Sequence, residues 1–323
     1  VSRHRPETIA ALEAMIDRLT EARSSETGEV GRNCRLTGAR FIREVRIGDN
    51  VEVDGASALV NGTLRDGVHV GVDVKAYDFI VAEGARIDNG TTLERCFVGE
   101  SCIMDKGFTA AESLFFANSH CENGEAAAIF AGPYTVSHHK SSLLIAGMFS
   151  FFNAGSGSNQ SNHLFKSGAV HQSVHLRGCK FASSAYIMSP ALEGAFTMVM
   201  GHHSYHHDTS IFPYSYLIEK EGRSVLMPGA NLSSYGAVRD IEKWPARRKV
   251  RRDVINFEEY NPYVAGAMLR AVDMLHRLEE QDPDAPVYTY NKVQIRAAAL
   301  QRGLKLYNRA IVAALGALLD KGE

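Results

Sequence analysis

The phrases IGDNVEV (47–53), LRDGVHVG (64–71), VAEGARIDNG (81–90) and CFVGESC (96–102) decide the fold of this chain. They carry aliphatic residues at six-residue intervals, at Ile47, Val53 and Leu59, then at Leu64 and Val70, and then at Val81, Ile87 and Leu93. Gly, Asn and Asp occupy many of the positions between them. Repeats of this kind are typical of a parallel β-helix, in which each side of a coil is one short strand and the aliphatic residue faces the interior.

The repeat is imperfect, and one other fold competes with the β-helix. The six-residue spacing breaks between Leu59 and Leu64 and again over residues 74–81, where we expect insertions or slips in the winding. An antiparallel β-sandwich with glycine-rich turns is the alternative, but sandwich turns usually recur roughly every 8 to 12 residues. We therefore predict a mainly β chain whose β-helix covers residues 33–237 and carries long excursions.

The N-terminal region, residues 1–32, has a helical pattern followed by a polar connector. Apolar residues recur there at three- and four-residue intervals, at Ile9, Leu12, Met15, Ile16 and Leu19. This spacing predicts an amphipathic helix over residues 6–22. We expect its apolar stripe to pack on something.

The C-terminal region changes composition sharply. SYLIEKEGRSVLMPGANL (215–232) predicts a last pair of strands that ends in a Pro-Gly turn. Residues 238–323 then predict a basic linker and a helical hairpin. Its two helical patterns cover residues 264–278 and 293–318. The Pro-containing segment DPDAP (282–286) separates them as a rigid break.

Length and composition restrict the class of protein. At 323 residues and 45% hydrophobic content, the chain can bury a sizeable core. A net charge of -2 provides no overall field for nucleic acid or membranes, and no apolar run approaches the roughly 20 residues that span a bilayer. Five widely spaced cysteines argue against a disulfide framework and fit a reducing compartment. We expect a cytoplasmic protein that binds neither nucleic acid nor membrane.

The same phrases resemble known proteins. The hexads are similar to those of the left-handed β-helix in the hexapeptide-repeat superfamily. Longer phrases closely resemble an uncharacterised bacterial family of such proteins, a domain of unknown function, namely residues 123–168, SYLIEK (215–220), MPGANL (227–232) and RDIEKWPARR (239–248). The resemblance covers nearly the whole chain and implies a left-handed parallel β-helix but no reaction. Members of the family are longer at the N-terminus, so this chain would correspond to their C-terminal half.

The wider superfamily adds expectations about assembly and activity. Its members are commonly homotrimers, so the resemblance implies three subunits here. Its best-known members are acyltransferases, with nucleotidyltransferase domains and zinc carbonic anhydrases as relatives. No catalytic motif of the superfamily is matched residue by residue, so these activities enter as analogies.

The stretch from Asn118 to Asp208 concentrates the residues that could carry chemistry. Ten of the thirteen histidines lie between His120 and His207, and that span contains three glutamates, Glu122, Glu125 and Glu193, and no aspartate. It includes the phrases FAGPYTVSHHK (130–140), FFNAGSGSNQSNHLFKSG (151–168) and GHHSYHHDTS (201–210). Because a disordered segment would contain less Phe, Leu, Ile and Met, we predict an ordered binding surface.

The predicted catalytic group is Asn162, His163, Lys166 and His171. A histidine with a pKa near its ordinary value of about 6.5 can take a proton from a hydroxyl or amine, and amide groups can stabilise an oxyanion. The predicted substrate contacts are polar neighbours of this group, namely Asn153, Ser156, Asn159, Gln160, His138, His139 and Lys140. A loop held together by its own Asn and Ser hydrogen bonds is the alternative.

A metal site is a second hypothesis for the same stretch. Imidazole is a common ligand of zinc, and GHHSYHHD holds four histidines. On a single strand, however, the Cα atoms of His202 and His206 would lie about 13 Å apart. Ligands from different coils or subunits, such as His171 with His202 or His206, make the better arrangement. Histidines that form hydrogen bonds without any ion are the alternative.

Two segments suggest anion binding more weakly. Residues 155–160 lack the third glycine of a dinucleotide fingerprint and the Gly-Lys-Ser/Thr of a P-loop, so only a looser anion-binding nest remains. Residues 239–252 carry seven basic side chains. These could hold the phosphates of a donor, but we favour a solvated face or a subunit interface. No basic stripe interleaved with aromatic residues predicts nucleic acid.

Together the patterns predict a group-transfer enzyme that moves an acyl group to a sugar or amino substrate. His163 or His171 would be the general base at a subunit interface, Asn162 and Lys166 would polarise or anchor the substrate, and acyl-CoA would be the donor. A metal-dependent hydrolase or lyase with a zinc-type divalent ion, similar to carbonic anhydrase, is one alternative. A non-catalytic structural or ligand-binding scaffold is the other.

Overall fold

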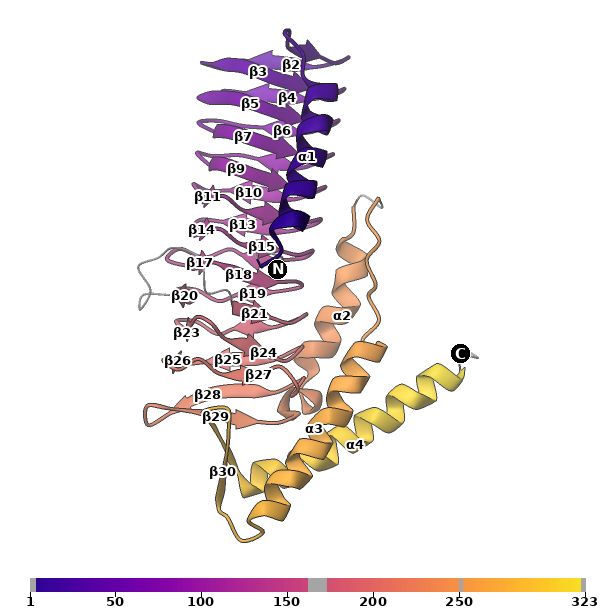
Figure 1. Ribbon diagram of the computed structural model, residues 1–323. Helices are drawn as coiled ribbons and strands as arrows, with labels where there is room; N and C mark the ends of the chain where they lie inside the picture. The colour runs from indigo at the N-terminus through magenta and orange to yellow at the C-terminus, as the bar shows by residue number, and fades with distance from the viewer. Residues whose placement is uncertain (1–3, 162–172, 250–251, 321–323) are drawn as a thin grey trace.

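The computed structural model describes residues 4–161, 173–249 and 252–320. The chain winds into a parallel β-solenoid of about ten coils, with one helix at its N-terminal end and a group of helices at its C-terminal end (Figure 1). The helices are α1 (Pro6–Arg23), the short 3-10 helix η1 (Ala230–Ser233), α2 (Tyr235–Arg247), α3 (Pro262–Gln281) and α4 (Ala297–Asp320). The predicted fold class, a left-handed parallel β-helix with a helical region at each end, is confirmed.

Two sides of every coil belong to one sheet of 17 strands. Neighbouring strands in it are parallel, because each coil repeats the path of the previous one. Its strands are β1 (Glu29–Val30), β3 (Ile42–Ile47), β5 (Ala58–Leu64), β7 (Lys75–Val81), β9 (Thr92–Val98), β11 (Thr109–Ala111), β12 (Leu114–Phe115), β14 (Glu125–Ala127), β15 (Phe130–Ala131), β17 (Leu143–Ile145), β18 (Gly147–Phe149), β20 (Asn159–Ser161), β21 (Ser173–His175), β23 (Tyr186–Met188), β24 (Leu192–Glu193), β26 (His202–His203) and β27 (Asp208–Thr209).

The third side of every coil belongs to a second sheet, of 14 strands. It is parallel through the solenoid and ends in two antiparallel pairs, β28 with β29 and β30 with β31. Its strands are β2 (Arg35–Thr37), β4 (Glu52–Asp54), β6 (His69–Val70), β8 (Arg86–Ile87), β10 (Ile103–Asp105), β13 (His120–Glu122), β16 (Val136–Ser137), β19 (Asn153–Ala154), β22 (Lys180–Phe181), β25 (Met198–Met200), β28 (Tyr216–Lys220), β29 (Arg223–Met227), β30 (Val287–Tyr290) and β31 (Val293–Arg296).

The register of the first coils explains the break in the six-residue spacing. Leu59 pairs with Ala76 and Ala76 pairs with Leu93, so these coils take 17 residues. The predicted insertion between Leu59 and Leu64 is wrong, because β5 runs without interruption from Ala58 to Leu64. A single left-handed residue, Asn61 with φ 51°, turns that corner. Asn and Asp tolerate this conformation better than most residues, so one corner takes five residues where six were expected.

The interior of the solenoid changes character along its axis. The aliphatic residues of the hexads face inward, and Ile47, Val53 and Leu64 are no more than 2% exposed. Farther along, Phe152 and Phe181 are equally buried, together with the polar side chains of His175 and Glu193. The later coils therefore enclose charge as well as apolar surface.

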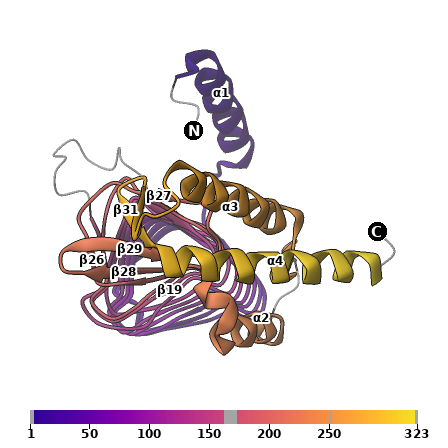
Figure 2. The ribbon, with the colours of Figure 1, turned by 90° about the horizontal axis from the view of Figure 1, so that it is seen from below.

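Helix α1 lies outside the solenoid with its axis along the stack of coils (Figure 1), and Figure 2 shows it standing apart from them. None of its residues is buried. Leu12, Met15, Ile16 and Leu19 are each about half exposed, at 48% to 59%. The predicted helix is confirmed, but within one chain its apolar stripe does not find the packing partner that we expected.

A β-hairpin separates the two long C-terminal helices. The sequence pattern placed Val293 on the second helix, and this is wrong, because Val293 lies in β31 and α4 begins only at Ala297. All four residues of VYTY are β-branched or aromatic, and VQIR alternates β-branched with polar residues, both of which favour strands. Asn291 and Lys292 form the turn between them, both with positive φ. Turns of this kind join antiparallel strands.

The basic run that precedes α3 is used within the chain. Arg248 pairs with Asp253, and Arg252 pairs with Glu83 on the solenoid. In the same region the Trp244 ring lies 4.4 Å from that of Phe151, between ring centroids. These contacts tie the basic run to the coils of its own chain, and the predicted solvated face or subunit interface stays a prediction.

All five cysteines are unpaired, as the sequence predicts. Among the residues that the structure describes, no helix combines the length and the hydropathy required of a membrane span.

Candidate functional site

The predicted catalytic group lies outside the described residues. Asn162, His163, Lys166 and His171 all belong to residues 162–172, between the end of β20 and the start of β21. Their assignment therefore stays a prediction.

The predicted substrate contacts divide between the surface and the interior. His139, Lys140, Asn153 and Ser156 are exposed, and His138 and Asn159 are partly buried. Gln160 is fully buried and points into the coil, where neither end of its amide finds a partner among the described residues. His138 is the member of this set that lies directly against another histidine.

The two described members of the predicted metal set are not brought into a metal site. His202 is exposed on β26, whereas His206 lies beyond this strand, beside the pocket described below. Across residues 4–161, 173–249 and 252–320, no group of three or more His, Cys, Asp or Glu side chains has the geometry to hold a metal ion. His171 lies outside these ranges.

A cluster of polar side chains gathers on the outer surface of the 14-stranded sheet. It consists of Lys106, His120, Glu122, Asn123 and His138, and we call it the His120 cluster. Strand alternation sends Cys121 inward, so His120 and Glu122 both point outward from β13. Lys106 and His138 follow the adjacent strands β10 and β16, and the parallel register stacks them beside β13.

Hydrogen bonds fix the geometry of the His120 cluster. His120 Nε2 lies 2.9 Å from Glu122 Oε1, and Lys106 Nζ lies 2.5 Å from Glu122 Oε2. The ring of His138 meets the ring of His120 edge-on, with centroids 4.2 Å apart. Asn123 Nδ2 donates to the carbonyl oxygen of His138 at 3.1 Å.

The charges of this cluster follow from its contacts. Burial acts to raise the pKa of Glu122, but the hydrogen bonds from Lys106 and His120 outweigh it and lower that pKa. Burial, and then the proximity of His120, lower the pKa of His138 to about 4. At neutral pH the cluster therefore holds an ionised Glu122 beside a neutral His138.

This arrangement leaves one nitrogen of His120 available as a base. Because Glu122 is ionised and can only accept, Nε2 carries the proton, so Nδ1 is the nitrogen on which the imidazole would act as a base. Nδ1 forms no hydrogen bond to the described residues, and the side chain of His120 is 31% exposed. A carboxylate that orients a histidine in this way is a recurring device of general base catalysis.

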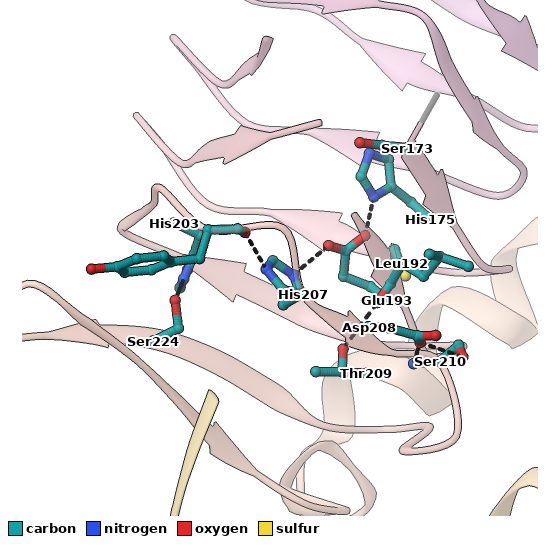
Figure 3. A network of polar contacts seen from close by, with 12 residues as sticks. Ser173, His175, Leu192, Glu193, His203, His207, Asp208, Thr209, Ser210 and Ser224 are labelled. Carbon is teal, nitrogen blue, oxygen red and sulfur yellow. Dashed lines mark hydrogen bonds and ion pairs between the residues drawn. The ribbon is translucent and has the colours of Figure 1, made fainter. Parts of the chain in front are cut away.

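A second group of histidines is enclosed by the later coils, and Figure 3 shows its contacts. Glu193 accepts hydrogen bonds from His175 Nδ1 and, at 2.7 Å, from His207 Nε2. His207 Nδ1 lies 3.1 Å from the carbonyl oxygen of Tyr205. We call His175, Glu193 and His207 the Glu193 triad.

Protonation states in the Glu193 triad can be assigned from its partners. Burial acts to raise the pKa of Glu193, but His175 and His207 outweigh it and hold that pKa at about 2. Both ring nitrogens of His207 face acceptors, so both must carry protons. In agreement, the hydrogen bond to Glu193 raises the pKa of His207 against the opposing effect of burial. The triad thus contains a buried ion pair between Glu193 and His207, and His175 is hydrogen-bonded to the other carboxylate oxygen.

A neutral histidine lies next to the triad. His203 Nε2 donates to the carbonyl oxygen of Met200 at 3.2 Å, and Nδ1 accepts from Ser224 Oγ at 2.8 Å. Burial, and then the nearby His207, lower the pKa of His203 to about 4. This side chain therefore holds β26 to β29 without carrying charge at neutral pH.

The Glu193 triad is suited to structure more than to proton transfer. Both nitrogens of His207 are occupied, and the remaining nitrogen of His175 is buried against aromatic rings such as those of Phe152 and Phe181. A pocket of about 310 Å³ lies beside His207, lined by Pro190, Leu192, His206, His207, Asp208, Asn291 and Lys292. This pocket offers a surface for binding but no free base from the triad.

The sequence carried a signal for the residues that were missed. His120 and Glu122 stand two positions apart, which places both on one face of a strand. Both lie in the polar stretch from Asn118 to Asp208. Without the register of the coils, however, the sequence does not show that His138 lies beside them. Lys106 lies outside that stretch, so only its position one coil away connects it to Glu122.

Comparison with known proteins gives a family and distant fold relatives. The sequence profile of a family described as a domain of unknown function, DUF4954, matches residues 1–279. A search of curated proteins finds no match.

The solved structures that match include three UDP-N-acetylglucosamine acyltransferases. The Arabidopsis protein is 10% identical over 89% of this chain and 95% of its own, with a TM-score of 0.25. The Moraxella catarrhalis protein is 11% identical over 88% and 96%, with a TM-score of 0.27, and the Bacteroides fragilis protein is 11% identical over 81% and 92%, with a TM-score of 0.29. Similarity at this level carries no functional argument.

Proposed function

The chain belongs to this family of unknown function, and from that premise we propose that it is a group-transfer enzyme that moves an acyl group to a hydroxyl or amine of a small molecule. The single observation that supports this proposal best is the His120–Glu122 contact. It provides an accessible ring nitrogen beside an oriented carboxylate. Acyl transfer requires little more than such a base, an anchored substrate and a donor of the acyl group.

The proposed reaction uses His120 as the base. Its Nδ1 takes the proton of the acceptor hydroxyl or amine while the acceptor atom attacks the carbonyl carbon of an acyl thioester such as acyl-CoA. The tetrahedral intermediate collapses, the carbon–sulfur bond breaks, and the thiolate leaves and takes the proton back from the imidazolium. Glu122 stabilises the imidazolium in between, and Lys106 keeps Glu122 ionised.

The predicted residues of the neighbouring stretch complete the proposal. Asn153 points outward on β19, two strands from His120 in the same sheet, and would contact the acceptor together with His139 and Lys140. His163 or His171 as an alternative base, with Asn162 and Lys166 as anchors, stays part of the proposal. These four residues lie outside the described ranges.

We propose that the active form is a homotrimer whose subunits enclose the substrate. His120 lies on the outside of a sheet, so a neighbouring subunit is needed to exclude water from it. The 17-stranded sheet presents an outward column of apolar side chains in adjacent strands, formed by Ile80, Phe97, Leu114, Phe130 and Met148. Exposed apolar patches of this kind mark interaction surfaces. The unpaired cysteines are consistent with a cytoplasmic location.

The experiment measures thiol release from acetyl-CoA in the presence of a panel of amino sugars and sugar alcohols. We expect His120→Gln to lower kcat by about a hundredfold or more, the contribution usual for a general base, with a smaller change in KM. Glu122→Gln should lower kcat less and shift its pH profile, because the carboxylate orients the base and does not accept the proton. His276→Gln, on the exposed surface of α3, is the matched control.

Full activity of the His120→Gln variant would refute the assignment of the base. If His163→Gln or His171→Gln abolishes turnover while His120→Gln does not, the base lies in the 162–172 segment. Stoichiometric zinc in the purified protein would favour the metal-dependent hydrolase or lyase. If the purified protein contains no stoichiometric metal and shows no turnover, a non-catalytic scaffold is favoured.

A further inference from the structure

A cavity of about 360 Å³ lies where the β28–β29 hairpin meets β31. Figure 1 shows this hairpin at the C-terminal end of the solenoid. The lining of the cavity is mostly polar and consists of Lys220, Glu221, Arg223, Val225, Gln294 and Arg296. Three of these side chains are cations and one is an anion. The cavity therefore has an excess of two positive charges.

The three cations share the lining of one cavity, and strand register brings two of them, Lys220 and Arg223, directly together. Lys220 stands directly opposite Arg223 in the last pair of the hairpin. In the parallel pair of β29 and β31, Val225 stands opposite Gln294, so Arg223 and Arg296 lie four positions apart along the strands and line the cavity from its two ends. Like charges that face each other across strands are destabilising. The fold holds these charges together against their mutual repulsion.

No carboxylate neutralises the three cations. Of the ion pairs within 4.0 Å that the described residues form, none includes Lys220, Arg223 or Arg296. Elsewhere on the solenoid basic side chains are paired across coils, as Lys106 is with Glu122 and Arg95 is with Glu112. An uncompensated basic group at a concave site attracts anions and raises their local concentration.

We propose that this cavity binds the phosphate groups of a small phosphate ester. A phosphate group carries close to two negative charges at neutral pH, which matches the excess charge of the cavity. The planar guanidinium groups of Arg223 and Arg296 can each bind two oxygens of a phosphate group, and Lys220 adds a third positive charge beside Arg223. The amide of Gln294 supplies a neutral donor to the same ligand.

The phosphate cavity is separate from the His120 cluster. Five strand spacings in the 14-stranded sheet, from β13 to β28, correspond to about 24 Å. The proposal therefore does not rest on the proposed function, and either can fail without the other.

Calorimetric titration of the full chain with sodium pyrophosphate and with inorganic phosphate, at constant ionic strength, tests the proposal. We expect saturable binding at one site per chain, tighter for pyrophosphate because it carries more charge. The double variant Arg223→Gln with Arg296→Gln should weaken the Kd at least tenfold. Arg309→Gln removes an exposed arginine of α4 and should leave the Kd unchanged.

A second measurement separates lost binding from lost folding. Without ligand, the double variant should melt at or above the temperature of the natural protein, because the substitutions remove repulsion between like charges. Pyrophosphate should raise the melting temperature of the natural protein and of Arg309→Gln only. The proposal would be overturned if the heat of binding does not saturate, or if the double variant binds pyrophosphate with the same Kd as the natural protein. It would also be overturned if chloride at the same ionic strength raises the melting temperature as much as pyrophosphate does.

Discussion

Glu193 is a fully buried carboxylate in the interior of a β-solenoid, a position that β-helices usually fill with aliphatic side chains. Charge is expensive to bury unless it is paired and hydrogen-bonded. Both oxygens of Glu193 meet this condition, through His175 on the coil before it and His207 on the coil after it. Three successive coils are thereby linked through one carboxylate.

We expect Glu193→Gln to lower the free energy of unfolding by about 3 kcal/mol at pH 7. Removal of one partner from a buried ion pair typically costs about 3 to 5 kcal/mol, because the other charge stays buried without compensation. Glutamine keeps the volume of the side chain, but it removes the charge and replaces one acceptor oxygen with an NH2 donor. Urea denaturation with an unchanged m value gives the measurement.

A double-mutant cycle provides the control for Glu193→Gln. His207→Gln removes the opposite charge, so the double variant should be more stable than the sum of the two single losses implies. Strictly additive losses would contradict the ion pair.

At the scale of elements, the unpartnered surfaces of α1 and of the apolar column are the most informative features. Helix α1 carries an apolar stripe, and none of its residues is buried against the described part of its own chain. The column runs along the axis of the solenoid, and Figure 1 shows α1 lying along the same axis. Each surface would gain stability by burial against a second copy of the chain.

We expect Phe130→Glu to dissociate the oligomer. Phe130 is 41% exposed and lies in the middle of the apolar column, where a buried carboxylate would have no partner. Light scattering coupled to size exclusion should report about three times the chain mass of 35.4 kDa for the natural protein and the single-chain mass for the variant. Tyr263→Glu, on the exposed surface of α3, is the control. A monomeric natural protein would refute the trimer.

At the scale of the whole molecule, the buried histidines give stability a predictable pH dependence. His138 and His203 have a pKa of about 4 in the folded chain, against an ordinary value of about 6.5. Between these two values the unfolded chain binds protons that the folded chain does not, so the free energy of unfolding should fall as pH drops from about 6.5 to 4. For His203 alone, the free energy of unfolding should fall by about 3 kcal/mol over this pH range.

His207 changes the free energy of unfolding with pH in the opposite direction to His138 and His203. Its raised pKa contributes stability that is fully present below about pH 6.5 and is lost as pH rises through the folded value. Thermal unfolding monitored by circular dichroism from pH 4.5 to 9 should therefore give a maximum near neutrality. His203→Gln should flatten the acid side of the curve, whereas His276→Gln should not change it. If the stability of His203→Gln falls at acid pH as steeply as that of the natural protein, the effect belongs to other groups.

Much of the fold was readable from the sequence because its repeat is local. An inward aliphatic side chain every six residues, as at Ile47 and Val53, needs no knowledge of distant contacts. The hairpin of β30 and β31 was missed because VQIR adjoins a long helix and was counted with it. Its Asn291-Lys292 turn was the overlooked signal.

By itself, the sequence determined the coil, its inward face and the polar stretch that holds His120, Glu122 and His138. Only the tertiary structure decided which polar side chains meet. Lys106 and Glu122 are 16 positions apart, His175 and Glu193 are 18 apart, and Glu193 and His207 are 14 apart. These separations differ because coils differ in length and successive sides are joined by different corners. A small change in a corner shifts the register of every later strand, and with it the partner of each outward or inward side chain.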